Sequence, residues 1–162
     1  GEYQIENTAT AVAAVRAFAQ NISDDTIQKG LEESHFSGRF ELIAPNIMVD
    51  GAHNAQGLRA LYKSLSVAYP KEKITLIIGS LMDKNVTAEF NEILRDDRFN
   101  IVLVPFSGPN GRPSLSIEQT LKQYQVSAMP HWQEAVEKST ADLTVLTGSL
   151  YFISEVREQY DR

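Results

Sequence analysis

The residues Asp50-Gly51-Ala52-His53-Asn54 bring a carboxylate, an imidazole and a side-chain amide together within five positions. They follow the apolar run Ile47-Met48-Val49 and precede a helical pattern that begins near Gln56. Turns that lead from a strand into a helix are where open α/β sheets place their ligand chemistry. We therefore interpret Asp50 and His53 as candidate catalytic residues.

Ser149 is a further candidate, because it follows an apolar strand in the run Thr147-Gly148-Ser149-Leu150-Tyr151. Together with Asp50 and His53 it suggests a serine hydrolase, but the G-x-S-x-G turn that exposes such a nucleophile is absent. A hydroxyl and backbone amides at the start of a helix are better suited to binding an anion or a carboxylate. The alternative that Ser149 only caps the helix stays open.

Strands and helices alternate along most of the chain, and this alternation must position the candidate residues. Apolar runs predict strands at 40–43, 47–50, 74–78, 101–104 and 143–146. Apolar residues at helical spacing predict helices at about 7–20, 24–33, 56–69, 86–94, 116–124, 131–139 and in the last residues of the chain.

The order of these elements predicts an α/β fold, a Rossmann-like, doubly wound and mostly parallel sheet of about six strands. The runs 40–43 and 47–50 are too close for a crossover helix, so we expect one antiparallel edge strand. The loops after the parallel strands then meet at one edge of the sheet. Of the three histidines, only His53 is expected at that edge.

Several classes of site lack their signatures. The sequence contains no G-x-x-x-x-G-K-[ST] run, so we expect no phosphate-binding loop in this chain, and no G-x-G-x-x-G run of a dinucleotide site. The pairs Asp24-Asp25 and Asp96-Asp97 are interpreted as solvated helix ends. The absence of cysteine excludes thiolate nucleophiles and Cys-based metal sites and fits a reducing cytoplasm.

Composition and charge restrict the partners. The formal net charge of −6 argues against nucleic-acid binding but leaves room for a small anionic ligand. No apolar run is long enough to span a membrane, and no signal peptide opens the chain, so we expect a cytoplasmic protein without a membrane partner. Because the chain starts inside a patterned segment without an initiator Met, we expect it to be a fragment.

Five runs, in order along the chain, resemble the folylpolyglutamate synthetases, members of the Mur ligase superfamily. They are Gly1-Glu2-Tyr3-Gln4-Ile5-Glu6-Asn7-Thr8-Ala9, Gly38-Arg39-Phe40-Glu41, Asp50-Gly51-Ala52-His53-Asn54, Leu81-Met82-Asp83-Lys84-Asn85 and Leu146-Thr147-Gly148-Ser149-Leu150-Tyr151. Three positions depart from the family pattern: Tyr3 replaces His, Ala55 stands where Pro is common, and Asn85 replaces Asp. The role of the Asp83-Lys84-Asn85 run stays open.

The resemblance implies an ATP-dependent ligase that adds L-glutamate to the γ-carboxyl of folates or folylpolyglutamates through an acyl phosphate, with Mg²⁺ as the metal. It divides the chain into residues 1–36, the end of a central ATPase domain, and residues 37–162, the C-terminal α/β domain. The phosphate-binding loop and the metal ligands are expected in the missing N-terminal domain. We therefore expect this chain to be inactive alone.

Carried over residue by residue, the resemblance places Asn7 at the adenine and Arg39 and Asp50 at the nucleotide. It assigns His53 and Ser149 to the incoming glutamate. Chemically, Arg39 offers positive charge for phosphates, and Asp50 can accept hydrogen bonds from ribose hydroxyls or an amine.

Two other interpretations stay open. The first is a Mur-type peptidoglycan ligase. Such ligases usually carry Asp-Asp-Tyr-Ala-His-Asn-Pro where this chain has Asp50-Gly51-Ala52-His53. A non-catalytic nucleotide-binding or interaction module is the second. Whether a dihydrofolate synthase activity accompanies the ligase, which folate is preferred, and the oligomeric state are not decided by the sequence.

Overall fold

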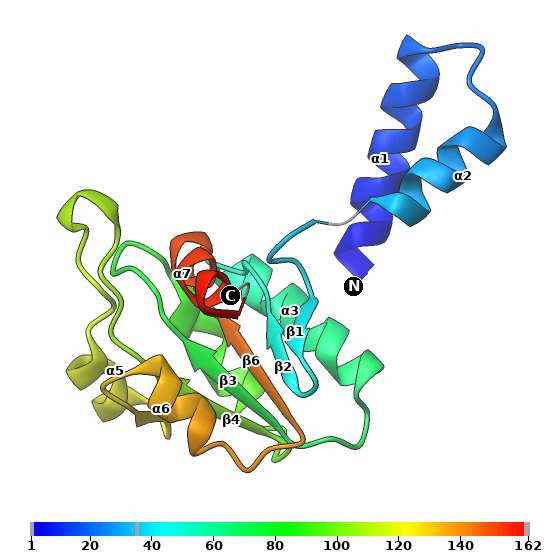
Figure 1. Cartoon of the computed structure of the whole chain (residues 1–162). Helices are drawn as coiled ribbons and strands as arrows, with labels where there is room; N and C mark the ends of the chain where they lie inside the picture. The colour runs from blue at the N-terminus through cyan, green and yellow to red at the C-terminus, as the bar shows by residue number, and fades with distance from the viewer. Residues whose placement is uncertain (1, 35, 161–162) are drawn as a thin grey trace. The chain divides into compact units, whose positions relative to one another are not determined.

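The computed structural model describes residues 2–34 and 36–160 and divides the chain into two compact units, Gly1–Ser37 and Gly38–Arg162. The second unit contains a six-stranded sheet with helices on both faces (Figure 1). The predicted α/β architecture is thereby confirmed. None of the helices among the described residues is long and apolar enough to cross a membrane.

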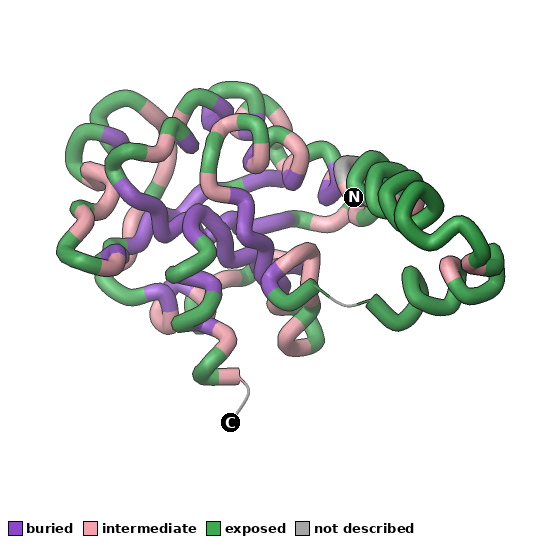
Figure 2. Tube along the Cα trace, turned by 90° about the horizontal axis from the view of Figure 1, so that it is seen from above, coloured by how far each residue is buried: buried purple, intermediate pink, exposed green. Residues whose placement is uncertain are grey.

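The first unit consists of α1 (Glu2–Phe18) and α2 (Asp24–Glu33). The hydroxyl of Ser23 caps α2 by accepting a hydrogen bond from the Thr26 amide at 3.2 Å, as Ser does at many helix starts. No side chain described in this unit is buried, and Phe18 is 95% exposed (Figure 2). These helices therefore have no hydrophobic core of their own.

The sheet of the second unit has the strand order β1-β2-β6-β3-β4-β5. Its strands are β1 (Glu41–Ala44), β2 (Ile47–Val49), β3 (Ile74–Ile78), β4 (Phe99–Leu103), β5 (Ser127–Ala128) and β6 (Leu143–Thr147). The β1–β2 pair is antiparallel and every other pair is parallel, as predicted. The two-residue strand β5 was not predicted, because it has no apolar run of its own.

Two layers of helices cover the sheet. The helices are α3 (Ala55–Ala68), the 3-10 turn η1 (Val86–Glu89), α4 (Phe90–Ile93), α5 (Ile117–Gln123), α6 (Trp132–Glu137) and α7 (Leu150–Tyr160). Leu76 of β3 packs in a cluster with side chains from α3 and α4, whereas its neighbour Ile77 packs with side chains from α6 and α7. Successive strand residues point to opposite faces, so a nearly all-apolar strand serves both layers.

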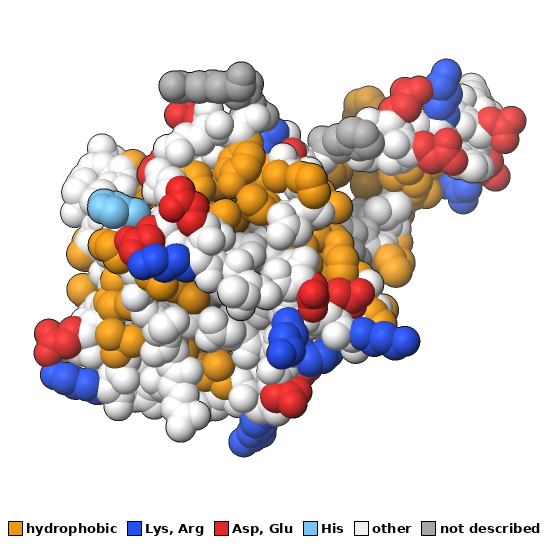
Figure 3. All heavy atoms as spheres, turned by 60° about the horizontal axis from the view of Figure 1, so that its bottom comes forward, with side chains coloured by type: hydrophobic (Ala, Val, Ile, Leu, Met, Phe, Trp, Pro, Cys, Tyr) orange, Lys and Arg blue, Asp and Glu red, His pale blue; other side chains and the backbone are white. Residues whose placement is uncertain are grey.

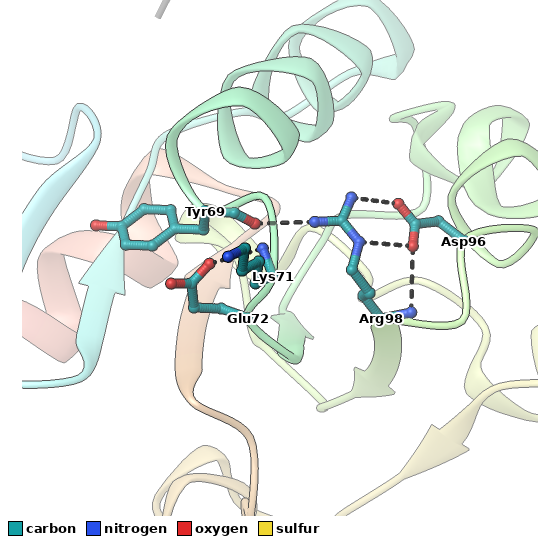
Figure 4. A network of polar contacts seen from close by, with 5 residues as sticks. All are labelled: Tyr69, Lys71, Glu72, Asp96 and Arg98. Carbon is teal, nitrogen blue, oxygen red and sulfur yellow. Dashed lines mark hydrogen bonds and ion pairs between the residues drawn. The ribbon is translucent and has the colours of Figure 1, made fainter.

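A polar network closes the end of the sheet where β3 and β4 begin (Figure 4). The Arg98 guanidinium donates to both carboxylate oxygens of Asp96, at 3.0 and 2.6 Å, and to the carbonyl of Tyr69 at 2.9 Å. The hydrogen bond from Arg98 holds the pKa of Asp96 below its ordinary value. The expectation of a solvated Asp96 is therefore wrong, because its side chain is only 19% exposed and is ion-paired.

Candidate functional site

The strands β2, β6 and β3 are neighbours in the sheet, and their C-terminal ends form the edge that holds most of the candidate residues. The helices that follow β2 and β3 pack on one face, whereas α7, which follows β6, packs on the other. Such a change of face between neighbouring strands opens a crevice in doubly wound sheets, and ligands bind there.

Hydrogen bonds from backbone amides and from the Thr147 hydroxyl join the three loops at this edge. The carbonyl of Ala52 accepts from the Gly148 amide at 2.8 Å and from the Thr147 hydroxyl at 3.1 Å, and the Gly79 amide donates to the Thr147 carbonyl at 3.0 Å. Gly148 has φ of +111°, and a Cβ there would lie 2.7 Å from the carbonyl oxygen of Gly79. Only glycine accommodates this approach and this backbone conformation.

Asp50 is 2% exposed and organises the loops around it. One carboxylate oxygen accepts from the backbone amide of Phe40 at 2.9 Å, and the other accepts from the amide of Ala52 at 2.8 Å. Phe40 has a φ of +49°, which is uncommon for a non-glycine residue. The bond from Asp50 thus supports a strained turn directly after Arg39.

Further contacts support the same turn from other elements. The Gly51 amide donates to the Gly38 carbonyl at 2.7 Å, and the Gly38 amide donates to a carboxylate oxygen of Glu41 at 2.5 Å. Glu41 is ion-paired with Arg157 of α7 at 3.1 Å. Three separate elements therefore determine where Arg39 lies. Neither Glu41 nor Arg157 was singled out as a site residue from sequence, because their partnership spans 116 positions.

The Arg39 side chain lies against the glycine of the 50–54 turn. Its Nη1 would be 3.1 Å from a Cβ placed on Gly51, so the guanidinium packs directly over that residue. Arg39 is half-buried, and within the described part of the chain its side chain has no hydrogen bond or ion pair. A guanidinium in this state can bind phosphate or carboxylate oxygens.

His53 is half-buried, and one hydrogen bond within the described residues defines its orientation. Its Nδ1 lies 2.8 Å from the carbonyl oxygen of Gly51. Because a carbonyl can only accept, Nδ1 must carry the hydrogen, and in the neutral ring Nε2 then holds the lone pair. The arrangement suits Nε2 to accept a proton. The adjacent Asn54 is structural, since its side chain caps α3 by accepting from the Gly57 amide at 2.8 Å.

Ser149 directly precedes α7, and its carbonyl accepts from the Ile153 amide at 3.0 Å. It therefore occupies the position of a capping residue and is 4% exposed. However, its hydroxyl makes no hydrogen bond to any group in the described residues. A hydroxyl in this state at the start of a helix is suited to bind a ligand oxygen.

Asn7, the fifth candidate, lies elsewhere in the chain. It is an exposed residue of α1 in the first unit, which the structure describes separately from the sheet. The edge of the sheet thus holds Arg39, Asp50, His53 and Ser149, and the predicted role of Asn7 stays a prediction.

The described residues contain no group of three or more His, Cys, Asp or Glu side chains that could hold a metal ion. On the face drawn in Figure 3, basic side chains are interspersed with acidic ones and form no continuous stripe.

Comparison with known proteins identifies the family. Residues 38–150 match the model of the Mur ligase, glutamate ligase domain, which is most of the chain and nearly all of the second unit. The chain belongs to this family. The matched segment includes the four candidate residues at the edge of the sheet.

Individual members of the family match almost the whole chain. A folylpolyglutamate synthase from Lacticaseibacillus casei is 34% identical over 98% of this chain and 38% of its own length. The solved structure of a folylpolyglutamate synthase from Thermotoga maritima is 30% identical, with a TM-score of 0.74, and covers 99% of this chain and 39% of that one. The solved structure of E. coli FolC in complex with DHPP and ADP is 26% identical, with a TM-score of 0.78, and covers 96% of this chain and 38% of that one.

The chain spans less than half the length of each of these relatives. Family membership therefore concerns the glutamate ligase domain that residues 38–150 match.

Proposed function

We propose that this chain is the C-terminal part of a cytoplasmic folylpolyglutamate synthase, which uses ATP to add L-glutamate to the γ-carboxyl of folates. The observation that carries the proposal is the pair of unsatisfied groups around the 50–54 turn. Arg39 packs over Gly51, and Leu150, the neighbour of Ser149, packs against the same glycine. Within the described residues, neither the guanidinium nor the Ser149 hydroxyl has a side-chain partner.

These groups match what an acid–amino-acid ligation needs. The γ-phosphoryl of ATP passes to the folate carboxylate, and the glutamate amine attacks the resulting acyl phosphate and releases phosphate. The Arg39 guanidinium would bind phosphate oxygens and stabilise their charge. The Nε2 lone pair of His53 would accept a proton from the glutamate ammonium, which has to lose it before attack. The Ser149 hydroxyl would bind a glutamate carboxylate.

Asp50 would act in this scheme mainly through other groups. Its two oxygens already accept backbone hydrogen bonds, and it is nearly fully buried. By holding the amides of Phe40 and Ala52, it positions Arg39 on one side of the turn and His53 on the other. Such preorganisation keeps the charges in place without reorganisation during the reaction.

The metal and the rest of the nucleotide site would come from the missing part of the protein. The reaction uses Mg²⁺ to neutralise phosphate charge, but the described acidic residues do not cluster as its ligands. We assign those ligands and the phosphate-binding loop to a preceding ATPase domain. Residues 1–36, with Asn7 as the adenine contact, would be the end of that domain.

Ligation assays on the full-length protein test this function. With ATP, Mg²⁺, a reduced folate and L-glutamate, we expect ADP release and a product heavier by one glutamyl residue, and no ADP release when glutamate is omitted. The 162-residue chain alone should show neither. Activity of the isolated chain would refute the two-domain account, and an inactive full-length protein would refute the function.

A further inference from the structure

Helix α7 contacts the turn that carries Arg39. Cγ2 of Ile153 would lie 3.2 Å from a Cβ placed on Gly38, so the helix packs directly on the residue before Arg39. One turn further along the helix, Arg157 is ion-paired with Glu41 of β1. Residues four apart share one face of a helix, so both contacts come from the same face of α7. The helix therefore reaches this turn on both sides of Arg39.

The ion pair between Arg157 and Glu41 uses both carboxylate oxygens. Nη2 of Arg157 donates to Oε1 of Glu41 at 3.1 Å, and Nε lies 3.1 Å from Oε2. The same Oε2 accepts from the Gly38 amide at 2.5 Å. The two side chains are only 26% and 29% exposed, so salt and water screen this pair less than a pair at the open surface. Glu41 is therefore held by a backbone amide and by a guanidinium from another element.

Two carboxylates hold the turn around Arg39, and both are engaged by other donors. Asp50 accepts from two backbone amides, and Glu41 accepts from a backbone amide and from Arg157. Among the described residues, the Arg39 guanidinium consequently has no carboxylate partner. Without Arg157, Glu41 would carry an uncompensated negative charge two residues from Arg39. Such a charge attracts the guanidinium and repels a phosphate, so both effects would weaken the binding of an oxyanion.

We propose that Arg157 is a positioning residue for the oxyanion site: its ion pair keeps the Glu41 carboxylate away from Arg39, so that the Arg39 guanidinium keeps its charge for a phosphate of the nucleotide. This inference rests on the proposed function, in which Arg39 binds phosphate oxygens, and adds Arg157 and Glu41 to it. Its distinguishing consequence is that removing the charge of Glu41 repairs the loss of Arg157. A residue that only packs α7 against the sheet would not be repaired in this way.

The first experiment measures the state of Arg39 without any activity, by treating the 162-residue chain with phenylglyoxal, which modifies free guanidinium groups, and mapping the products by mass spectrometry. In Arg157→Met, which keeps a long side chain against the turn, Arg39 should react about threefold more slowly, because Glu41 pairs with it. The double variant Arg157→Met with Glu41→Gln should react like wild type, since Gln still offers an acceptor to the Gly38 amide but carries no charge. Exposed Arg95 is the internal standard. An unchanged rate for Arg39 in Arg157→Met would overturn the proposal, and so would a slower rate that the double variant does not restore.

The second experiment measures the ligand through steady-state kinetics of the full-length protein. Arg157→Met should raise the KM of ATP about tenfold and change the KM of L-glutamate little, as expected when a phosphate contact is weakened. Arg157→Lys, which keeps a cation beside Glu41, and the double variant with Glu41→Gln should both return the KM of ATP to within about twofold of wild type. Lys122→Ala removes an exposed ion pair with Glu118 on α5 and should match wild type. A rise in the KM of L-glutamate alone would place the amino-acid carboxylate at Arg39 and overturn the phosphate assignment.

The outcomes separate this inference from the proposed function. An inactive wild-type enzyme refutes the function, whereas the phenylglyoxal reaction still decides whether Arg157 keeps Glu41 away from Arg39. An active wild type whose KM for ATP does not change in Arg157→Met refutes the inference alone. A KM that rises in Arg157→Met but is not lowered again by Glu41→Gln shows that Arg157 acts through the packing of α7, and overturns the mechanism proposed here.

Discussion

Two residues of the same turn, Asp50 and His53, are distinguished by what their side chains contact. Both Asp50 oxygens accept hydrogen bonds from backbone amides, whereas the His53 ring, among the described residues, bonds only through Nδ1. A buried group that organises backbone should affect both stability and activity when it is removed. A partly exposed group that touches the ligand should affect activity alone.

In the full-length protein, Asp50→Ala and His53→Ala should each lower the ligation rate at least about tenfold, a loss of about 1.4 kcal/mol of transition-state stabilisation. Asp50→Ala should also reduce the free energy of unfolding by about 1–3 kcal/mol, since two backbone amides lose their acceptor. Ligation kinetics and thermal melting measure the two effects.

Asp25→Ala and Asp97→Ala provide the matched controls, because both carboxylates are exposed and neither residue belongs to the loops at the edge of the sheet. They should change the rate and the stability little. If Asp50→Ala and His53→Ala melt normally and turn over at wild-type rates, the site assigned here is incorrect.

At the scale of elements, the junction of β3 and β6 depends on a glycine. A Cβ at Gly148 would approach the Gly79 carbonyl oxygen at 2.7 Å and the Ile78 side chain at 2.9 Å, in a backbone with φ of +111°. Gly148→Ala should therefore lower the free energy of unfolding of the second unit by more than about 1 kcal/mol. Urea denaturation followed by tryptophan fluorescence measures this through Trp132, which is 7% exposed in α6.

Gly30→Ala is the control for this prediction, because a Cβ at that position of α2 meets no atom within 4 Å. It should leave the unfolding of the second unit unchanged. Equal stability of Gly148→Ala and wild type would show that the β3 and β6 loops do not need this close approach.

The network at the other end of β4 predicts a dependence of stability on pH. Arg98 lowers the pKa of Asp96 in the folded state, so Asp96 binds a proton more readily when the chain is unfolded. Its stabilising contribution is present above the unfolded pKa, about 3.9, and is lost as pH falls through the lower folded value. In Asp96→Asn, the free energy of unfolding measured by urea denaturation should therefore fall less steeply at acid pH than in wild type. Asp97→Asn, which changes an exposed residue, should behave like wild type. If the free energy of unfolding falls with pH in parallel for Asp96→Asn and wild type, the lowered pKa of Asp96 in the folded state is contradicted.

For the whole molecule, the two units should differ in stability. No side chain described in α1 or α2 is buried, whereas the second unit has a hydrophobic core on each face of its sheet. In hydrogen exchange on a dilute sample, the amides of α1 should therefore be far less protected than those of β3 and β6. If the apolar side chains of α1 belong against a missing domain, protection should rise in the full-length protein. Strong protection of α1 in a dilute monomer would contradict this view.

Local spacing was sufficient to predict much of this protein. The alternation of apolar runs and helical stripes predicted the α/β class, the antiparallel β1–β2 pair and the place of Asp50, His53 and Ser149 at one edge of the sheet. Arg39 was predicted as a site residue only through the family resemblance. These features follow from the sequence because strand and helix periods are properties of neighbouring residues, and because parallel strands have to place their following loops together.

The partners of the site residues were decided only by the tertiary structure. The insertion of β6 between β2 and β3 brings Thr147 to Ala52, 95 positions away, and Asp83 meets Arg112 across 29 positions. No local sequence pattern encodes contacts between residues so far apart in the chain, since these contacts depend on strand order and on where each loop turns. For the same reason the sequence could name Asp50 as a candidate, but only the fold showed that its carboxylate holds the backbone of two loops.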